Sequence, residues 1–597
     1  MKPFKTLTPL ILTVAVGTGC TSLIPRKNNE KANITVPNPY NVLFVTYESM
    51  NTKHMTAYGG PHDSSPFSHD FSKKGVIFNH CYSASAWTSE NVASLFTGTS
   101  SLMHGLYSRN HHVPANWYTP FEMLRDAGYQ IPRMQGFQAD INYNQLGFTT
   151  GVNPVPGPEI VAKRDRGPKD ILQPLIWLEN HGEKPFFLWY HILNTHLPYN
   201  PEPWIINKFF NEEMIPNDKS RKRVDYVRNN GVCVWGSVDF VPKEDQEAIR
   251  GLYRGELYRA DRMFNLLYHK LKALNLDTNT IVVLTADHGE ELLEHGFIGH
   301  ASTAKRANVH DECIHIPLMI VLPGEIPQRL VIDQQVRSID IMPTIFDLMG
   351  LEIPEYMQGK SLMPMIQDPD NAEERDAIVS TSYAGFKEDD PANITHFMRA
   401  VRNKQWKLII DDDNGEITQQ LFNLQDDPGE HTDVAHQHPE VVSVLRAKYD
   451  AWAANAEDQK KLFMQKQYTD PAFRRTALQK LFAKFKLPPK PIPKDCPSPP
   501  QITKPTEGQI LSIETTGGLV EIEWTGMEKV PYLLEVELGE GDYNFSVFLK
   551  AKGPRLDRKF RESYWNTYVA DYDPGRVRVK IDRPEYEWSS WRNVRLE

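Results

Sequence analysis

Hydrophobic positions along the first two thirds of the chain form two kinds of pattern. Short, nearly continuous apolar runs rich in β-branched and aromatic residues are typical of strands buried on both faces of a parallel sheet. Four such runs are NVLFVTY (41–47), KPFFLWYHI (184–192), TIVVLTA (280–286) and IPLMIVLPG (316–324). Residues 247–274 instead repeat apolar side chains at spacings of three and four and contain no proline, as an amphipathic helix does. Strands that alternate with helices predict an α/β fold, with a mostly parallel sheet flanked by helices.

The last third of the chain changes pattern several times. Residues 377–435 are predicted to be a smaller α+β piece that completes the same domain, which then spans 39–435. A charged helical segment is expected over 436–482, and the prolines of 483–503 indicate a stiff, extended linker. Beyond it, apolar residues alternate with period two between turn residues. This pattern predicts a small β-sandwich of the immunoglobulin or fibronectin kind over 504–597.

The first twenty residues differ from the rest of the chain. MKPFK is positively charged, LTPLILTVAV is apolar, and GTGC contains the small residues of a cleavage site. An apolar stretch this short is typical of an export signal rather than of a membrane span. Cys20 resembles the cysteine of a bacterial lipoprotein cleavage box, although Gly17 departs from that pattern; an ordinary signal peptide with an incidental cysteine is the alternative.

We therefore expect a lipoprotein-type signal peptide at 1–20 and a polar tether at 21–38. The protein would be exported to the periplasmic face or the surface of a bacterial envelope. No other stretch reaches eighteen apolar residues, so membrane contact is expected through the lipid anchor only.

Composition and charge narrow the classes of partner. The chain has 597 residues, of which 40% are hydrophobic and 11% aromatic, enough for a large core. Its net charge of −10 without a long basic run argues against nucleic acid as a partner. Four cysteines outside the leader could form two disulfides with three possible pairings, and the sequence does not choose among them. They are Cys81, Cys233, Cys313 and Cys496. No C-x-x-C pair is present, which disfavours a structural zinc site built on cysteines.

Polar residues that could carry chemistry follow the predicted strands, where open α/β enzymes place their reacting groups. They are Glu48 and Ser49 after the first run, His196 after the second, Asp287 and His288 after the third, and His300 in a glycine-punctuated loop. Carboxylates together with imidazoles favour Zn²⁺ or Mn²⁺, whereas Ca²⁺ and Mg²⁺ are disfavoured. Thr88 precedes a predicted helix, whose N-terminal amides would face an anionic ester. A metal beside its hydroxyl would help to make Thr88 a nucleophile.

Six segments in matching order resemble the sulfatase-like branch of the alkaline phosphatase superfamily over about residues 40–435. They are NVLFVTYESMNTKHMTAYGG, TSENVASLFTGTSSLMHG, TADHGEELLEHGFIGH, HDECIHIPLMIVLPG, SIDIMPTIFDLMGLEIPEYMQGKSL and LFNLQDDPGEHTDVA. The resemblance implies an alkaline-phosphatase-like sheet and a metal-dependent hydrolase or phosphotransferase.

The nucleophile segment departs from the pattern of sulfatases proper. Those enzymes carry C/S-x-P-x-R, whose first residue is oxidised to formylglycine. Here Thr88, Glu90 and Val92 stand at the nucleophile, proline and arginine positions, and threonine cannot become formylglycine by that oxidation. Cys81 is followed by Tyr-Ser-Ala-Ser and does not restore the motif. The double aspartate of sulfatases after the first strand is replaced by Glu48-Ser49.

The combination of Glu, Thr, Asp and His is similar to the metal set of phosphoethanolamine transferases, phosphoglycerol transferases and lipoteichoic acid synthases, in which the threonine is phosphorylated in mid-cycle. The resemblance implies that Glu48, Thr88, Asp287 and His288 hold the metal and that Thr88 is also the nucleophile. His196 and His300 would bind phosphoryl oxygens or handle leaving-group protons.

Three functions remain open. The favoured one is a metal-dependent hydrolase or transferase that acts on phosphate esters or diesters through Thr88. The alternatives are a sulfatase that lacks formylglycine and a catalytically inactive envelope-binding protein. The substrate is expected to be an anionic ester, with an envelope lipid or glycan as candidates.

Simpler structural roles compete at individual positions. Thr88 could be only a helix N-cap, a role that threonine fills well. Glu48 could be a surface carboxylate, and His196 a core histidine. His104 is expected to be a structural residue at a helix end, and Glu294 and His295 are expected to be solvated.

Overall fold

The computed structural model describes residues 39–107, 119–126, 128–135, 169–180, 184–231, 241–300, 308–382 and 396–466, together with strands between 502 and 596. The predicted signal peptide and tether lie outside the described residues, as does most of the proline-rich linker. Their boundaries stay predictions.

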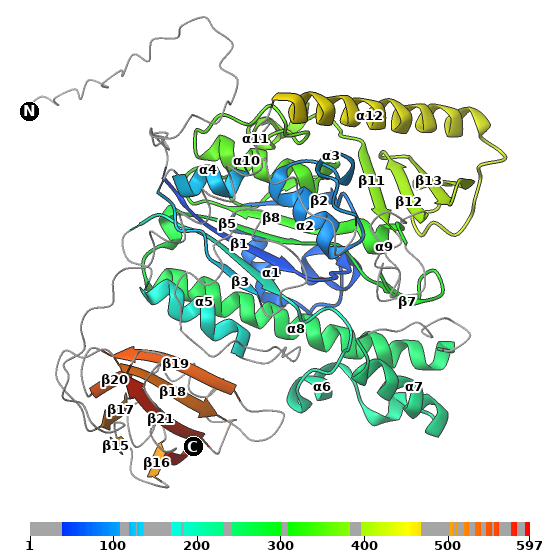
Figure 1. The fold of residues 1–597 in the computed structure, drawn as a ribbon. Helices are drawn as coiled ribbons and strands as arrows, with labels where there is room; N and C mark the ends of the chain where they lie inside the picture. Colours follow the sequence, from blue (N-terminus) through cyan, green and yellow to red (C-terminus); the bar gives the residue numbers. More distant parts are fainter. Residues whose placement is uncertain are drawn as a thin grey trace, which may run out of the picture.

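An eight-stranded, mostly parallel sheet forms the centre of the fold (Figure 1). Its strand order is β10-β2-β8-β5-β1-β4-β3, and β9 pairs with β2 outside this path. β1 is parallel to both β4 and β5, whereas β8 is antiparallel to β2 and β5. The bounds are β1 Asn41–Tyr47, β2 Val76–Tyr82, β3 Arg133–Gln135, β4 Phe187–Ile192, β5 Thr280–Ala286, β8 His315–Val321, β9 Leu330–Ile332 and β10 Val336–Arg337. The four apolar runs are therefore strands, as predicted: they form β1, β4, β5 and β8.

Helices cover both faces of this sheet (Figure 1). One group consists of α1 Pro66–Ser72, α5 Lys169–Asn180 and α8 Lys243–Ala273, and the other of α2 Thr88–Thr97, α3 Ser101–His104, α4 Pro120–Asp126, α10 Ile341–Leu348 and α11 Met363–Gln367. The predicted helix 247–274 corresponds to α8. Phe96 of α2 packs onto the sheet, with its ring centroid 5.1 Å from Phe44 and 4.8 Å from Trp189. These buried aromatic contacts fix the helix that begins at Thr88.

Short elements complete the core domain. α6 Pro203–Phe209 and α7 Asp218–Asn229 pack on α8, and β6 Glu291–Leu292 pairs with β7 Ile298–Gly299 in a hairpin after β5. α9 Asp311–Ile314 leads directly into β8. The 3₁₀ helices are η1 Thr52–His54, η2 Thr56–Tyr58, η4 Glu212–Met214, η5 Asp277–Asn279, η6 Ser338–Asp340 and η7 Pro369–Asn371.

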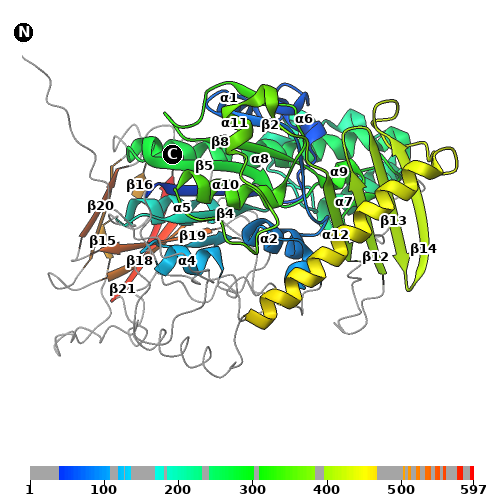
Figure 2. The ribbon, with the colours of Figure 1, turned by 90° about the horizontal axis from the view of Figure 1, so that it is seen from above.

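A second, antiparallel sheet follows the central one in sequence, in the order β11-β12-β13-β14. Its strands are β11 Ala377–Ser382, β12 His396–Arg402, β13 Trp406–Asp413 and β14 Glu416–Asn423. Figure 2 shows α12 Pro439–Lys466 crossing over β12 and β13, where Leu445 and Tyr449 share an apolar cluster with Leu408. The buried Lys407 ammonium lies 2.8 Å from the Asp311 carboxylate, which ties this sheet to α9. The four strands fall within the predicted piece 377–435, whereas α12 falls within the predicted helical segment 436–482.

The C-terminal region contains strands in two further sheets, ordered β15-β17-β20 and β16-β22-β21-β18-β19. Their pairs are antiparallel except for the parallel pair of β16 with β22. The bounds are β15 Ile502–Lys504, β16 Gln509–Leu511, β17 Leu519–Trp524, β18 Tyr532–Leu538, β19 Phe545–Ala551, β20 Arg555–Lys559, β21 Gly575–Ile581 and β22 Arg592–Leu596. The strands predicted for this region are confirmed.

Two further findings bear on the sequence predictions. Among the helices of the described ranges, none is both long and apolar enough to cross a bilayer. Cys81 and Cys313 are buried free thiols, so neither takes part in a disulfide. Cys233 and Cys496 lie outside the described residues.

Candidate active site

The predicted site residues meet where three adjacent parallel strands end. Tyr47 of β1 is in register with Ala286 of β5, and Glu48 and Asp287 directly follow these two residues. β4 runs parallel on the other side of β1. Because parallel strands present their carboxyl ends at one edge, residues far apart in sequence become neighbours there. Glu48 and Asp287 are both buried.

The Thr88 hydroxyl points into this edge. Its Oγ1 lies 3.4 Å from Glu48 Oε1 and 3.1 Å from His288 Nε2. Thr88 is the first residue of α2, and the preceding N-cap residue, Trp87, makes no side-chain capping bond. The Thr88 side chain therefore faces the carboxylate and the imidazole and is not the N-cap of its helix.

Glu48, His191 and Asp287 form a buried cluster that could hold a metal ion, with one ligand atom from each lying within 4.8 Å of the others. His191 Nε2 is 3.6 Å from Glu48 Oε2 and 4.0 Å from Asp287 Oδ2. Asp287 Oδ1 accepts hydrogen bonds from the backbone amides of Ser49, at 3.0 Å, and His288, at 2.8 Å. Ser49 adopts a left-handed backbone, with φ of 56°.

The chemistry of this cluster fits a divalent cation. Asp287 Oδ2 and His191 Nε2 are buried and have no hydrogen-bond partner within the described part of the chain. In the same ranges, Asp287 pairs with histidines and with no lysine or arginine. Burial lowers the pKa of His191 to about 4, so its ring is neutral and can act as a ligand. Two carboxylates with neutral imidazole suit Zn²⁺ or Mn²⁺.

His288 is held in one tautomer. Its Nδ1 lies 2.8 Å from the carbonyl oxygen of Gly289, which can only accept, so Nδ1 donates and the neutral ring turns its Nε2 lone pair toward Thr88. Burial lowers the pKa of His288, and the nearby Asp287 opposes that shift. His288 Nε2 is 3.4 Å from Asp287 Oδ2. The four residues predicted to hold the metal, Glu48, Thr88, Asp287 and His288, are thus brought together.

His196 and His300 flank the same space. The ring centroid of His300 lies 4.9 Å from that of His196 and 4.3 Å from that of His288. His196 Nε2 is 3.8 Å from Glu48 Oε1, while its Nδ1 is 2.6 Å from the Leu197 carbonyl oxygen. The two predicted proton-handling histidines therefore adjoin Glu48 and His288, the two residues that contact the Thr88 hydroxyl.

Glu290 orients His300. The Nδ1–H of His300 donates to Glu290 Oε2 at 2.8 Å. Burial lowers the pKa of His300 to about 4, with Asp287 acting in the opposite direction. A buried carboxylate that holds one nitrogen of a histidine fixes the ring for proton transfer at the other.

Sequence reasoning missed His191 and Glu290. The available signals were a histidine inside an otherwise apolar strand and a carboxylate two positions after His288. The expectation that His295 is solvated is wrong: its side chain is only 9% exposed and lies 3.1 Å from Glu312. Glu294 is half-buried, and its carboxylate accepts from the backbone of Leu292. His104 is buried at the end of α3, as expected for a structural residue.

Comparison with known proteins agrees with this fold. Residues 40–351 match the sulfatase family model, and residues 294–454 match the model for the C-terminal region of N-sulphoglucosamine sulphohydrolase. Arylsulfatase K from Bos taurus is 25% identical over 453 residues, covering 69% of this chain and 81% of the relative.

Solved structures share the architecture. Phosphonate monoester hydrolase of Agrobacterium radiobacter superposes with a TM-score of 0.55 at 19% identity, covering 70% of this chain and 96% of that protein. A structure in complex with its substrate D-glucosamine-2-N,6-O-disulfate gives a TM-score of 0.53 at 18% identity, covering 71% and 98%. At these identities the likeness shows the fold. The family match spans more than half of the residues, so the chain belongs to the sulfatase family, as a hydrolase of the alkaline phosphatase superfamily.

Proposed function

We propose that this protein is a metal-dependent enzyme that cleaves phosphate esters or diesters through Thr88 as nucleophile, with water or an alcohol as the final acceptor. The observation that carries the proposal is the position of Thr88 Oγ1 against both Glu48 and His288, beside the Glu48, His191 and Asp287 cluster. A divalent metal bound there would supply Lewis-acid activation of the ester oxygen and of the hydroxyl.

The residues of the site can carry out each proton and bond change. The Thr88 hydroxyl donates its proton toward Glu48 or His288 as Oγ1 attacks phosphorus, which forms a phosphothreonine and breaks the bond to the leaving alcohol. His196 or His300 delivers a proton to the leaving oxygen. Water or an acceptor hydroxyl then attacks phosphorus and releases Thr88.

The identity of the nucleophile favours phosphoryl over sulfuryl transfer. A formylglycine hydrate can expel sulfate by collapsing to an aldehyde, whereas a threonyl ester has no such route and must wait for an external nucleophile. A threonyl phosphate intermediate that reacts with water or alcohol matches this constraint. The absent C/S-x-P-x-R box points the same way.

Sulfate-ester hydrolysis without formylglycine is the second candidate. It is supported by the match to the N-sulphoglucosamine sulphohydrolase C-terminal model and by the disulfated glucosamine bound in one structural neighbour. The two candidates differ in substrate and in the fate of Thr88.

The test compares three aryl esters of one phenol (a phosphate monoester, a phosphate diester and a sulfate) with enzyme reconstituted in Zn²⁺ or Mn²⁺. We expect the diester or monoester to be turned over at least about 10²-fold faster than the sulfate. Acid-quenched enzyme should carry one phosphate at Thr88 by peptide mass spectrometry. Faster sulfate turnover, with Thr88 unmodified under phosphate substrates, would reject the proposal.

We also propose that the enzyme works at a bacterial envelope, anchored through a lipid on Cys20, where it acts on an anionic lipid or glycan ester. The support is the export-type leader ending in GTGC. Labelling cells with an alkyne fatty acid should mark the wild-type chain and leave Cys20→Ala unmarked. Equal labelling of both chains would rule out this anchor.

A further inference from the structure

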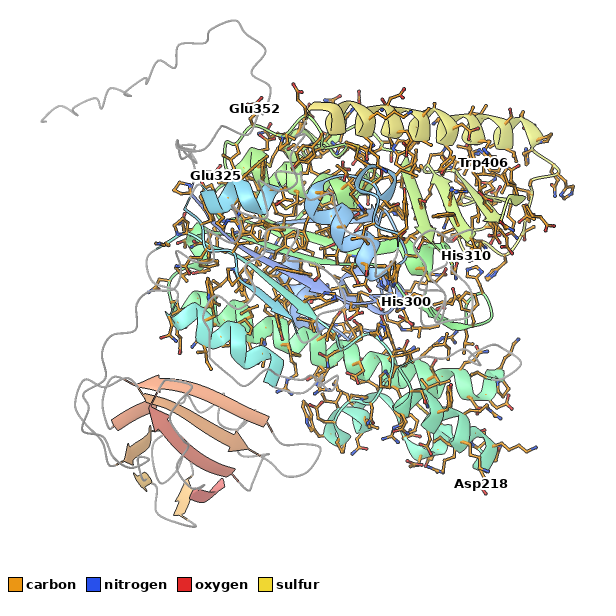
Figure 3. All side chains as sticks on the ribbon, in the orientation of Figure 1. Asp218, His300, His310, Glu325, Glu352 and Trp406 are labelled. Atoms are coloured by element: carbon orange, nitrogen blue, oxygen red, sulfur yellow. The ribbon has the colours of Figure 1, made fainter. Side chains whose placement is uncertain are left out.

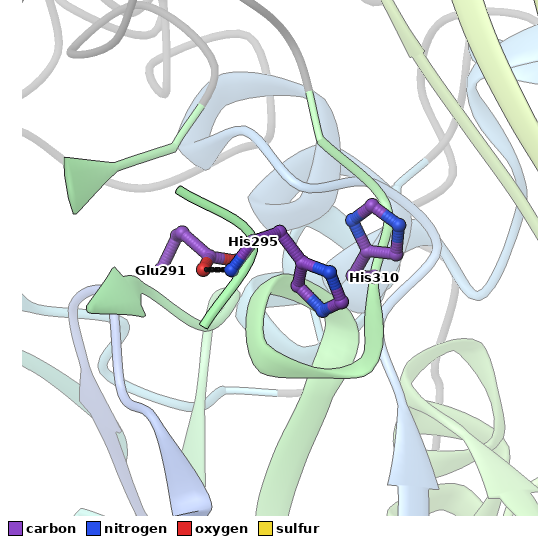
Figure 4. Close-up of side chains that lie close together, drawn as sticks. All are labelled: Glu291, His295 and His310. Atoms are coloured by element: carbon purple, nitrogen blue, oxygen red, sulfur yellow. Dashed lines mark hydrogen bonds between the residues drawn. The ribbon is translucent and has the colours of Figure 1, made fainter. Parts of the chain in front are cut away.

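A second cluster of histidines and carboxylates lies beside the active site. Glu291 and His295 belong to the segment of the β6–β7 hairpin, and His310 precedes α9. Figure 3 places His310 between His300 and the region of Trp406 in the second sheet, and the His310 ring lies 5.9 Å from that of Phe422 in β14. Figure 4 shows Glu291, His295 and His310 close together.

Glu291 is a buried carboxylate that accepts hydrogen bonds from neutral groups. Its side chain is 0% exposed. The backbone amide of His295 donates to one oxygen, and Asn308 Nδ2 donates to the other at 3.0 Å. Within the described ranges, Glu291 forms no ion pair with a lysine or arginine. A cation bound beside it would balance the ionised carboxylate.

His295 is arranged as a metal-binding histidine commonly is. Its Nε2 lies 3.1 Å from Glu312 Oε2, and Glu312 in turn is paired with Lys53. A carboxylate that accepts the N–H of one ring nitrogen leaves the lone pair of the other nitrogen available, which is the usual outer-shell arrangement around metal-bound histidine. The nitrogen left for a ligand is therefore Nδ1.

His310 supplies a third donor. Its Nδ1 is buried and makes no hydrogen bond within the described residues. Its ring is stacked on that of His295, with centroids 3.7 Å apart and planes 9° from parallel.

We propose that Glu291, His295 and His310 bind a second divalent cation, separate from the one at Glu48, His191 and Asp287. One ligand atom from each of the three lies within 4.8 Å of the others. A buried carboxylate with two imidazoles favours Zn²⁺, with the remaining coordination position left to water.

A neighbouring combination is a weaker candidate. His295, Glu312 and Glu430 also lie within reach of one another. There, however, the charge of Glu312 is balanced by Lys53, and the Lys407 ammonium is 2.7 Å from Glu430. Bound cationic side chains remove the need for a metal, whereas no lysine or arginine of the described ranges pairs with Glu291.

The second cation would tie the β6–β7 hairpin to the segment that enters α9. His300 directly follows β7, so this link would help to hold His300 in place next to His196 and His288. The inference does not depend on Thr88 being the nucleophile, since it rests on a different set of residues.

The test counts metal in the untagged full-length protein, stripped with a chelator and dialysed against buffered Zn²⁺. We expect two equivalents in the wild type by plasma mass spectrometry. The Glu48→Ala/Asp287→Ala double variant should retain one equivalent, bound at Glu291, His295 and His310. The His295→Gln/His310→Gln double variant should also retain one equivalent, bound at Glu48, His191 and Asp287. His269→Ala removes an exposed histidine of α8 and should retain both.

Co²⁺ identifies the site that is filled. In the Glu48→Ala/Asp287→Ala protein, Co²⁺ should give visible d–d absorption bands that disappear when His295→Gln and His310→Gln are added. Circular dichroism and the Tm check that each variant is folded. If His310→Gln does not fold, His310→Asn takes its place. A wild-type count of one equivalent, or a second equivalent unaffected by the histidine substitutions, would overturn the proposal.

Discussion

The hydroxyl oxygen of Thr88 lies 3.1 Å from Nε2 of His288, although 200 positions separate the two residues in the chain. The contact joins the first turn of α2 to the residues that follow β5. Asn91, one turn along the same helix, donates to the backbone carbonyl of Asp287, which holds the helix end against this strand end. The position of the hydroxyl is therefore set by two main elements of the fold.

Replacing the Thr88 hydroxyl should abolish turnover. Thr88→Ala is expected to lower kcat on the order of 10³-fold or more, because the attacking atom is lost, while Thr88→Ser should retain part of the activity. Ser89→Ala, which changes a buried hydroxyl at the next position, should stay within a few-fold of wild type. Steady-state kinetics with the best aryl ester measures all three. Near-native kcat in Thr88→Ala would assign the nucleophile elsewhere.

Removing His191 should weaken metal binding at the catalytic cluster. His191→Ala leaves Glu48 and Asp287 as close carboxylates without the imidazole between them, and the apparent Kd for Zn²⁺ should rise by about 10- to 100-fold. Thr46 bonds to the other ring nitrogen at 2.7 Å, and Thr46→Ser keeps that hydroxyl, so its Kd should be unchanged. Competition against a chromogenic chelator measures both values. An unchanged Kd in His191→Ala would limit His191 to a packing role.

Glu290 should act through His300. His300→Ala is expected to reduce kcat by about 10²- to 10⁴-fold, as for loss of a general acid or base. Glu290→Gln keeps an oxygen that can accept the hydrogen bond from His300 Nδ1 but removes the negative charge. Its kcat should therefore fall less than that of His300→Ala, with little change in KM.

The pH profile separates a positioning role from a structural one. The carboxylate charge stabilises protonated His300, so the acidic limb of kcat should move to lower pH in Glu290→Gln. A uniform fall in kcat and stability, with the limb unmoved, would contradict this role. Thermal unfolding of the same samples provides the stability control.

His104 should make the fold sensitive to mild acid. The Leu106 amide donates to its Nδ1 at 3.1 Å, so the buried ring is neutral, and burial lowers the pKa of His104 from 6.5 to about 3. Unfolded chains then bind a proton that the folded protein excludes. This proton binding lowers the free energy of unfolding. The loss is absent well above pH 6.5 and grows as the pH falls toward 3, reaching about 2 kcal/mol near pH 5.

Urea unfolding at neutral and mildly acidic pH measures this effect. Between pH 7.5 and pH 5, the free energy of unfolding should fall by about 2 kcal/mol less in His104→Gln than in the wild type. In the wild type, Ser94 and the Leu106 amide both form hydrogen bonds with the His104 imidazole, and a glutamine side chain can form both. Parallel loss of stability in both proteins would show that other groups account for the acid sensitivity.

The sequence by itself determined the central strands and the residues at their ends. Continuous apolar runs can be buried on both faces only inside a layered sheet, so β1, β4, β5 and β8 were recognisable from composition and length. The residues that follow such strands share one edge, which is why Glu48 and Asp287 could be grouped without a structure. Thr88 followed from the motif that surrounds it.

Tertiary structure alone decided which further side chains complete the sites. Strand register places His191 of β4 opposite Thr46 of β1, and only that alignment shows that its ring reaches the two carboxylates. The same holds for Glu290 with His300 and for His295 with His310, which come from a hairpin and a segment beside it. The pattern of the chain encodes which residues are buried, but the direction and partners of a buried polar side chain depend on packing between distant segments.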